Sequence, residues 1–130
     1  MAALLTVGAL VTALTTMGPA SAFDGPNGHH QFVQVISKYN GGWTLDMALH
    51  DKDGRTVYTW HKDHIQNYKE TLWYTIGAGY IDGTIVADNG DQPIARPFHY
   101  TAKDADGHCW VVDRRDVWLT GDTNGNCTPD

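Results

Sequence analysis

Regularly spaced turn signals divide this chain into short segments, and this spacing restricts its fold more than any other feature. Asn-Gly-Gly at 40–42, Asp-Lys-Asp-Gly at 51–54 and Asp-Ala-Asp-Gly at 104–107 each separate two apolar segments. Turn signals at intervals of about 8 to 12 residues are typical of β-sandwiches and barrels. Between two of them, residues 43–50 place an apolar side chain at every second position, as a half-buried strand does.

The acidic residues also favour a turn-rich β protein. Fourteen of the fifteen are Asp and one is Glu, Glu70, and there are 14 Gly. Asp is preferred in turns and Glu in helices, and no long window has the 3.6-residue periodicity of a helix. We therefore predict an all-β fold, an antiparallel sandwich or small barrel of about eight strands.

The expected strands are residues 32–38, 43–50, 56–61, 72–76, 84–87, 98–102, 109–112 and 117–120. Segments 98–102 and 109–112 are expected to pair as a hairpin through the turn at 104–107. Residues 61–70 do not fit this pattern and are expected to form a short helix or a long loop.

The first 22 residues have the pattern of a secretory signal peptide. An apolar run at 2–14 is too short to span a bilayer comfortably, and Ala20-Ser21-Ala22 follows as a small-residue cleavage site. One departure from the pattern is that no Lys or Arg precedes the apolar run. No later stretch is apolar enough for a stable membrane anchor. We expect a secreted, extracellular protein with a single domain at residues 23–130.

The two cysteines, Cys109 and Cys127, agree with an exported protein. A lone pair in an oxidising compartment is most simply a disulfide. It would tie the C-terminal tail to a strand and stabilise the fold by about 3 kcal/mol in the chain-entropy model.

Composition and motifs exclude several kinds of chemistry. A net charge of −6 argues against a nucleic-acid partner. Ser37 is the single Ser after residue 22 and has no glycine-rich elbow beside it. The Asp-rich turns lack the downstream Glu of a calcium loop, and His61-x-x-His64 is not a complete metal motif. We therefore expect neither a metal nor a cofactor.

A small secreted hydrolase, either a nuclease or a metal-dependent enzyme, remains the enzymatic alternative. Such an enzyme needs an acid, a base and a clamp for the substrate. The candidate catalytic residues are His61, His64, Glu70 and His99.

The aromatic residues point to a binding surface. The sequence has five Trp, six Tyr and three Phe. Trp43 and Trp110 have positions expected of core residues, and a purely structural role for all the aromatic residues is the alternative. Exposed aromatic rings on a sheet stack on sugars or anchor a protein partner. The predicted binding residues are Tyr58, Trp60, Trp73 and Trp118.

The motifs His108-Cys109-Trp110, Leu119-Thr120-Gly121-Asp122 and Cys127-Thr128-Pro129-Asp130, with the leader, resemble small uncharacterised secreted proteins of filamentous actinobacteria. That resemblance implies no activity.

The function that we predict is binding of an extracellular polysaccharide or protein, including inhibition of a protease through a loop at 61–70. A secreted hydrolase and a membrane-active toxin are the alternatives.

Overall fold

The computed structural model describes residues 25–38, 41–65, 69–88, 92–114, 116–125 and 127–129. The expected signal peptide therefore lies outside the described residues. The described elements are a short 3-10 turn η1 (Pro26–Gly28) and the strands β1 (Gln31–Ser37), β2 (Gly42–His50), β3 (Thr56–Ile65), β4 (Lys69–Tyr74), β5 (Tyr80–Ala87), β6 (Ile94–Thr101), β7 (Gly107–Val112) and β8 (Val117–Asp122).

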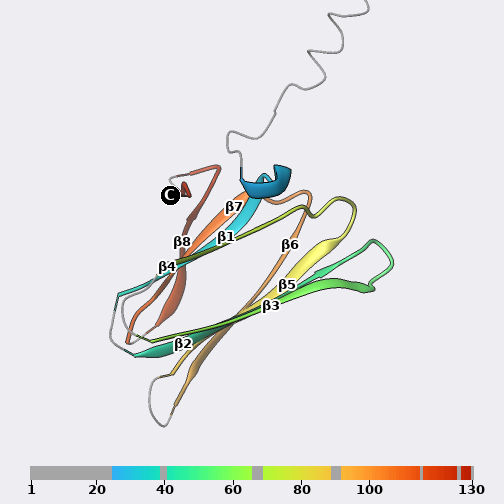
Figure 1. Ribbon diagram of the computed structural model, residues 1–130. Helices are drawn as coiled ribbons and strands as arrows, with labels where there is room; N and C mark the ends of the chain where they lie inside the picture. Colours follow the sequence, from blue (N-terminus) through green and yellow to red (C-terminus); the bar gives the residue numbers. More distant parts are fainter. Residues whose placement is uncertain are drawn as a thin grey trace, which may run out of the picture.

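The strands form two four-stranded sheets that face each other across one core (Figure 1). Sheet A has the order β4-β1-β7-β8, and sheet B has the order β3-β2-β5-β6. Every neighbouring pair is antiparallel except β1 with β7, which is parallel. The all-β prediction is confirmed, and the architecture is a sandwich and not a closed barrel.

Sheet B follows the alternation that the sequence predicts. Trp43, Leu45 and Met47 of β2 are buried and point into the core, because every second residue of a strand faces the same side. The turn at 51–54 closes the β2–β3 hairpin: the Asp51 carboxylate accepts hydrogen bonds from the backbone N–H groups of Asp53 and Arg55, both at 2.9 Å. Gly54 supplies a positive φ of 85° in this turn.

The centre of sheet A is buried on both faces. All six residues of β7 are buried, so this strand has no polar outer side. The disulfide Cys109–Cys127 brings the C-terminal tail over the outer face, where both cysteines pack with Phe32 and Trp73. This arrangement confirms the predicted disulfide and explains why Cys109 and Val111, which face outward from β7, are buried and not polar.

Two predictions about local structure were wrong. Residues 61–65 continue β3 as a strand, and β4 begins at Lys69, where a helix or long loop was expected. The polar side chains of this segment are accommodated because His61 and His64 each have a carboxylate partner on another strand. The predicted pairing across the turn at 104–107 does not form either. β6 belongs to sheet B and β7 to sheet A, so this connection passes between the sheets.

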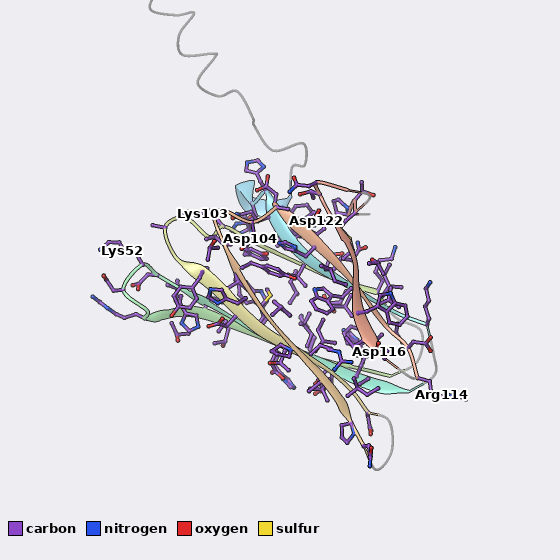
Figure 2. The ribbon with its side chains drawn as sticks, turned by 180° about the vertical axis from the view of Figure 1, so that it is seen from behind. Lys52, Lys103, Asp104, Arg114, Asp116 and Asp122 are labelled. Carbon is purple, nitrogen blue, oxygen red and sulfur yellow. A yellow bond between two sulfur atoms is a disulfide. The ribbon has the colours of Figure 1, made fainter. Side chains whose placement is uncertain are left out.

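Side chains fill the space between the sheets, and charged residues lie at the turns (Figure 2). Lys52 lies in the β2–β3 turn, and Arg114 lies in the β7–β8 turn. Arg96 connects the sheets at one side: its guanidinium donates to the Val117 carbonyl at 3.1 Å and to the Asp116 carboxylate at 2.7 Å. In the part of the chain that the structure describes, no helix is long and apolar enough to cross a bilayer.

Candidate functional site

A groove of about 590 Å³ lies at the side of the sandwich where β3 and β4 meet. Each of these strands is the edge of its own sheet and has one strand neighbour there. A free edge presents backbone N–H and C=O groups that no neighbouring strand uses. Tyr58, Trp60 and Lys62 line the groove from β3, and the residues of β4 line it from the other sheet. We call this cavity the aromatic groove.

Trp60 lies at the centre of the aromatic contacts in this groove. Its ring is 4.7 Å from the ring of Tyr58 and 6.4 Å from the ring of Tyr74, both in edge-to-face geometry. Tyr58 is 58% exposed, whereas Tyr74 is 1% exposed. Burial raises the pKa of the Tyr74 hydroxyl above its ordinary value. The three rings therefore extend from the core to the surface, and Tyr58 presents its ring to solvent.

Trp73 borders the aromatic groove from β4 and is held by the outer face of sheet A. Its ring is 5.1 Å from that of Phe32. A Cβ atom at Gly25 would overlap the Trp73 ring, so the Gly25 backbone lies directly against the indole. Trp73 also packs against the cluster of Phe32 and the disulfide. These contacts fix the orientation of an indole that is still partly accessible.

Polar residues line both ends of the aromatic groove. At one end the His64 Nε2–H donates to the Glu70 carboxylate at 2.7 Å, and both side chains are largely buried. The His64 ring also lies 4.7 Å from that of Trp43. At the other end His29 Nδ1 and the Thr75 hydroxyl are 2.7 Å apart. The groove thus combines aromatic rings with hydrogen-bonding groups, as ligand sites commonly do.

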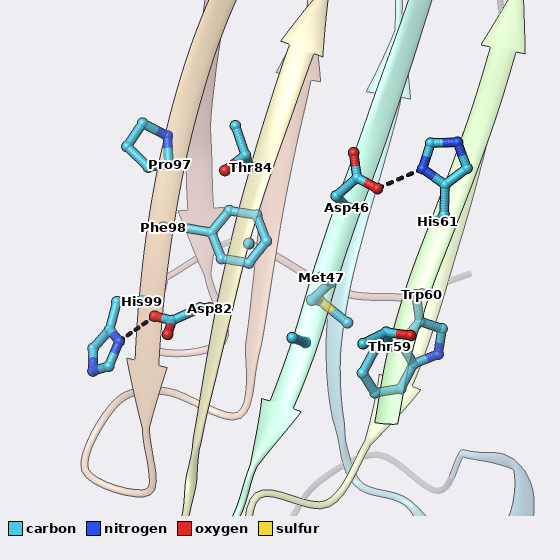
Figure 3. Close-up of a pocket in the computed structure, with 12 residues that line it drawn as sticks. Asp46, Met47, Thr59, Trp60, His61, Asp82, Thr84, Pro97, Phe98 and His99 are labelled. Carbon is cyan, nitrogen blue, oxygen red and sulfur yellow. Dashed lines mark hydrogen bonds and ion pairs between the residues drawn. The ribbon is translucent and has the colours of Figure 1, made fainter. Parts of the chain in front are cut away.

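A second, shallow depression of about 740 Å³ crosses the outer face of sheet B (Figure 3). His61 of β3 contacts Asp46 of β2 through Nδ1 and Asp63 through Nε2, the latter at 3.0 Å. Hydrogen bonds to Asp46 and then Asp63 raise the pKa of His61 above its ordinary value, because both carboxylates stabilise the imidazolium form.

Asp82 contacts two histidines on the other side of this face. Its carboxylate accepts a hydrogen bond from His99 Nδ1 at 2.5 Å and lies 3.7 Å from His50 Nε2. The Tyr80 ring lies between the two histidines, 4.7 Å from the His50 ring and 5.2 Å from the His99 ring. The small side chains of Ala48, Thr59 and Thr84 lie between these groups and line the depression.

The four candidate catalytic residues do not converge on one site. His61 and His99 line the depression on the outer face of sheet B from opposite edge strands, with β2 and β5 between them. At ordinary strand spacing these two edge strands are about 14 Å apart. His64 and Glu70 bond to each other beside the aromatic groove. His61 and His64 differ by three positions, so in a strand they face opposite sides of the sheet.

Three of the four predicted binding residues lie together. Tyr58, Trp60 and Trp73 all line the aromatic groove, whereas Trp118 lies on β8, the edge strand of sheet A farthest from β4. Sequence reasoning did not single out Lys62 and Tyr74 as groove residues. Lys62 had a usable signal, because it continues the every-second-residue series of Tyr58 and Trp60. Tyr74 had none, because its position depends on how the two sheets pack.

Within the described residues, no three His, Cys, Asp or Glu side chains are placed so that they hold a metal ion together. Comparisons with protein-family models, with curated proteins and with solved structures found no match. The function is therefore inferred from the geometry of the grooves.

Proposed function

We propose that this protein is an extracellular carbohydrate-binding protein that holds a glycan chain in the aromatic groove. The observation that carries this proposal is that Tyr58, Trp60 and Trp73, which are separated in sequence, line one open cavity. Aromatic rings present flat apolar faces, on which the C–H faces of sugar rings stack. The hydroxyl groups of a sugar need hydrogen-bond partners, and the free edges of β3 and β4 together with the polar ends of the groove supply them.

The shape of the groove favours an extended ligand. Tyr58 and Trp60 are two residues apart on the same face of β3, so their positions repeat at about 7 Å along the strand. A linear glycan has ring units in series, and a unit stacked on the exposed Tyr58 ring places its neighbours along the strand toward Trp60.

Binding is tested by co-sedimentation of the protein with chitin, cellulose and peptidoglycan, followed by titration with soluble oligosaccharides and tryptophan fluorescence. We expect saturable binding to at least one polymer with a spectral shift, because Trp60 and Trp73 border the groove. Replacing Tyr58 or Trp60 by Ala is expected to weaken binding about tenfold, since a stacked ring contributes roughly 0.5–1.5 kcal/mol beyond its buried area.

Tyr58→Ala is the cleaner of the two variants, because Tyr58 is 58% exposed and Trp60 packs against the core. Trp118→Ala is the matched control: it removes a partly exposed indole from the far edge of sheet A. Equal weakening by Tyr58→Ala and Trp118→Ala would contradict a site in the groove. Absence of binding to every polymer and oligosaccharide would refute a carbohydrate ligand.

A further inference from the structure

Among the described residues that line the aromatic groove, Lys62 is the single Lys or Arg. It lies on the same face of β3 as Tyr58 and Trp60, one step further along the strand. The residue is half-buried, and no described carboxylate forms an ion pair with its ammonium group. An ammonium group without a carboxylate partner in the fold is available to pair with an anion that enters the groove.

The groove contains a carboxylate, but that carboxylate has another partner. Glu70 is the single acidic residue among the described groove residues. It binds His64 at 2.7 Å, with 14% of the His64 side chain and 17% of the Glu70 side chain exposed. Glu70 is therefore directed to a neighbour within the fold. Lys62 is left to interact with what enters the groove.

From this placement we propose that the aromatic groove selects an anionic glycan, with a sugar carboxylate paired to Lys62. The inference rests on the proposed function and names its ligand class. Tyr58 stacks on the ring face of one unit, Trp60 borders the next unit, and Lys62, about 7 Å beyond Trp60 along β3, reaches the carboxylate of a following unit. Uronic acids and sugars with lactyl ethers both present such a carboxylate.

A sugar carboxylate paired with Lys62 adds affinity that stacking on the aromatic rings cannot supply. A hydrogen bond between an ammonium and a carboxylate is shorter and stronger than a bond between neutral groups. The partly buried position of Lys62 reduces screening by solvent and salt. Selection between neutral and anionic chains therefore depends on one side chain, whereas affinity for both depends on the rings.

The test compares two soluble hexasaccharides, neutral cellohexaose and anionic hexagalacturonate, by isothermal titration calorimetry at low salt. We expect hexagalacturonate to bind about tenfold more tightly, as one charge-assisted contact allows. In Lys62→Met the ratio of the two affinities is expected to fall to about one, and in Lys62→Arg it is expected to persist. Lys52→Met, which removes a charge from the exposed β2–β3 turn, is the control and should keep the wild-type ratio.

The outcomes separate this inference from the proposed function. Equal affinity of the wild-type protein for the two hexasaccharides would overturn the selection by charge and leave carbohydrate binding intact. So would a Lys62→Met variant that keeps the tenfold ratio. If neither hexasaccharide nor any polymer binds a folded protein, the carbohydrate function itself is wrong.

Discussion

At the scale of single residues, the most distinctive group is the His61 imidazole between two carboxylates. Both ring nitrogens have an Asp partner, Asp46 at Nδ1 and Asp63 at Nε2. A neutral imidazole donates through one nitrogen only, so the pair of contacts is complete only when the ring is protonated. This is why the pKa of His61 is raised. The stabilising contribution is present below the ordinary pKa of 6.5 and is lost as the pH rises through the folded value.

This arrangement predicts an NMR result. The pKa of His61, measured from the pH dependence of its ring resonances, should lie above 6.5. Asp46→Asn should lower it further than Asp63→Asn does, because Asp46 makes the larger contribution. His99 on the same face is the reference residue, because its carboxylate partner is Asp82 and neither substitution changes that contact. An unchanged His61 titration in Asp46→Asn would contradict the geometry.

At the scale of elements, the sequence predicted the strands better than their partners. The alternation of β2 and the Asp51 turn are local features, so both were correct. The polar residues of 61–70 predict a loop or short helix because they resemble a solvated segment, and their pairing with Asp46 of β2 and Glu70 of β4 forms only once the strands are in place. The edge strands β3 and β4 meet at the aromatic groove because of the way the two sheets pack, and no local sequence pattern encodes that packing.

The disulfide gives a prediction for the C-terminal tail. It joins β7 to Cys127 over a sequence separation of 18 and packs against Phe32. The double variant Cys109→Ser/Cys127→Ser should lower the free energy of unfolding by about 3 kcal/mol, because the unfolded chain regains loop entropy. Urea denaturation at one pH measures this loss, with the reduced wild-type protein as control. Retention of the wild-type midpoint in both samples would show that the tail adds no stability.

At the scale of the whole molecule, a buried histidine couples the fold to pH. His108 is 3% exposed, stacks on the Tyr100 ring at 3.5 Å, and its Nε2 has no hydrogen-bond partner among the described residues. Burial lowers its pKa below 6.5, although Asp122 and Asp104 act in the opposite direction. Tyr100 shares this environment, and burial raises its pKa to about 12.

The sign of the effect follows from proton binding by the two states. Below pH 6.5 the unfolded chain protonates His108 and the folded protein does not, so stability falls as the pH decreases from 6.5 to the folded pKa. His108 should therefore lower the urea midpoint at pH 5.5 relative to pH 7.5, and because His61 acts in the opposite direction, the comparison of wild type with a His108 variant isolates this effect. In His108→Phe, which preserves the stacked ring, the decrease should be smaller. If the urea midpoint decreases equally in the wild-type protein and in the variant, groups other than His108 cause the acid sensitivity.

The parallel pairing of β1 with β7 also determines how the chain reaches this fold. These neighbours pair Phe32 with Gly107 and Ser37 with Val112, so the centre of sheet A joins residues from distant parts of the sequence. Chains with such remote contacts fold slowly, because loop closure must precede the gain from pairing. The β2–β3 hairpin closes locally through the Asp51 turn. During synthesis it can form early, and β1 can pair with β4, whereas the pairing of β1 with β7 waits until residues 107–112 have been made. Until then one edge of β1 is unpaired, and an unpaired strand edge is prone to aggregation.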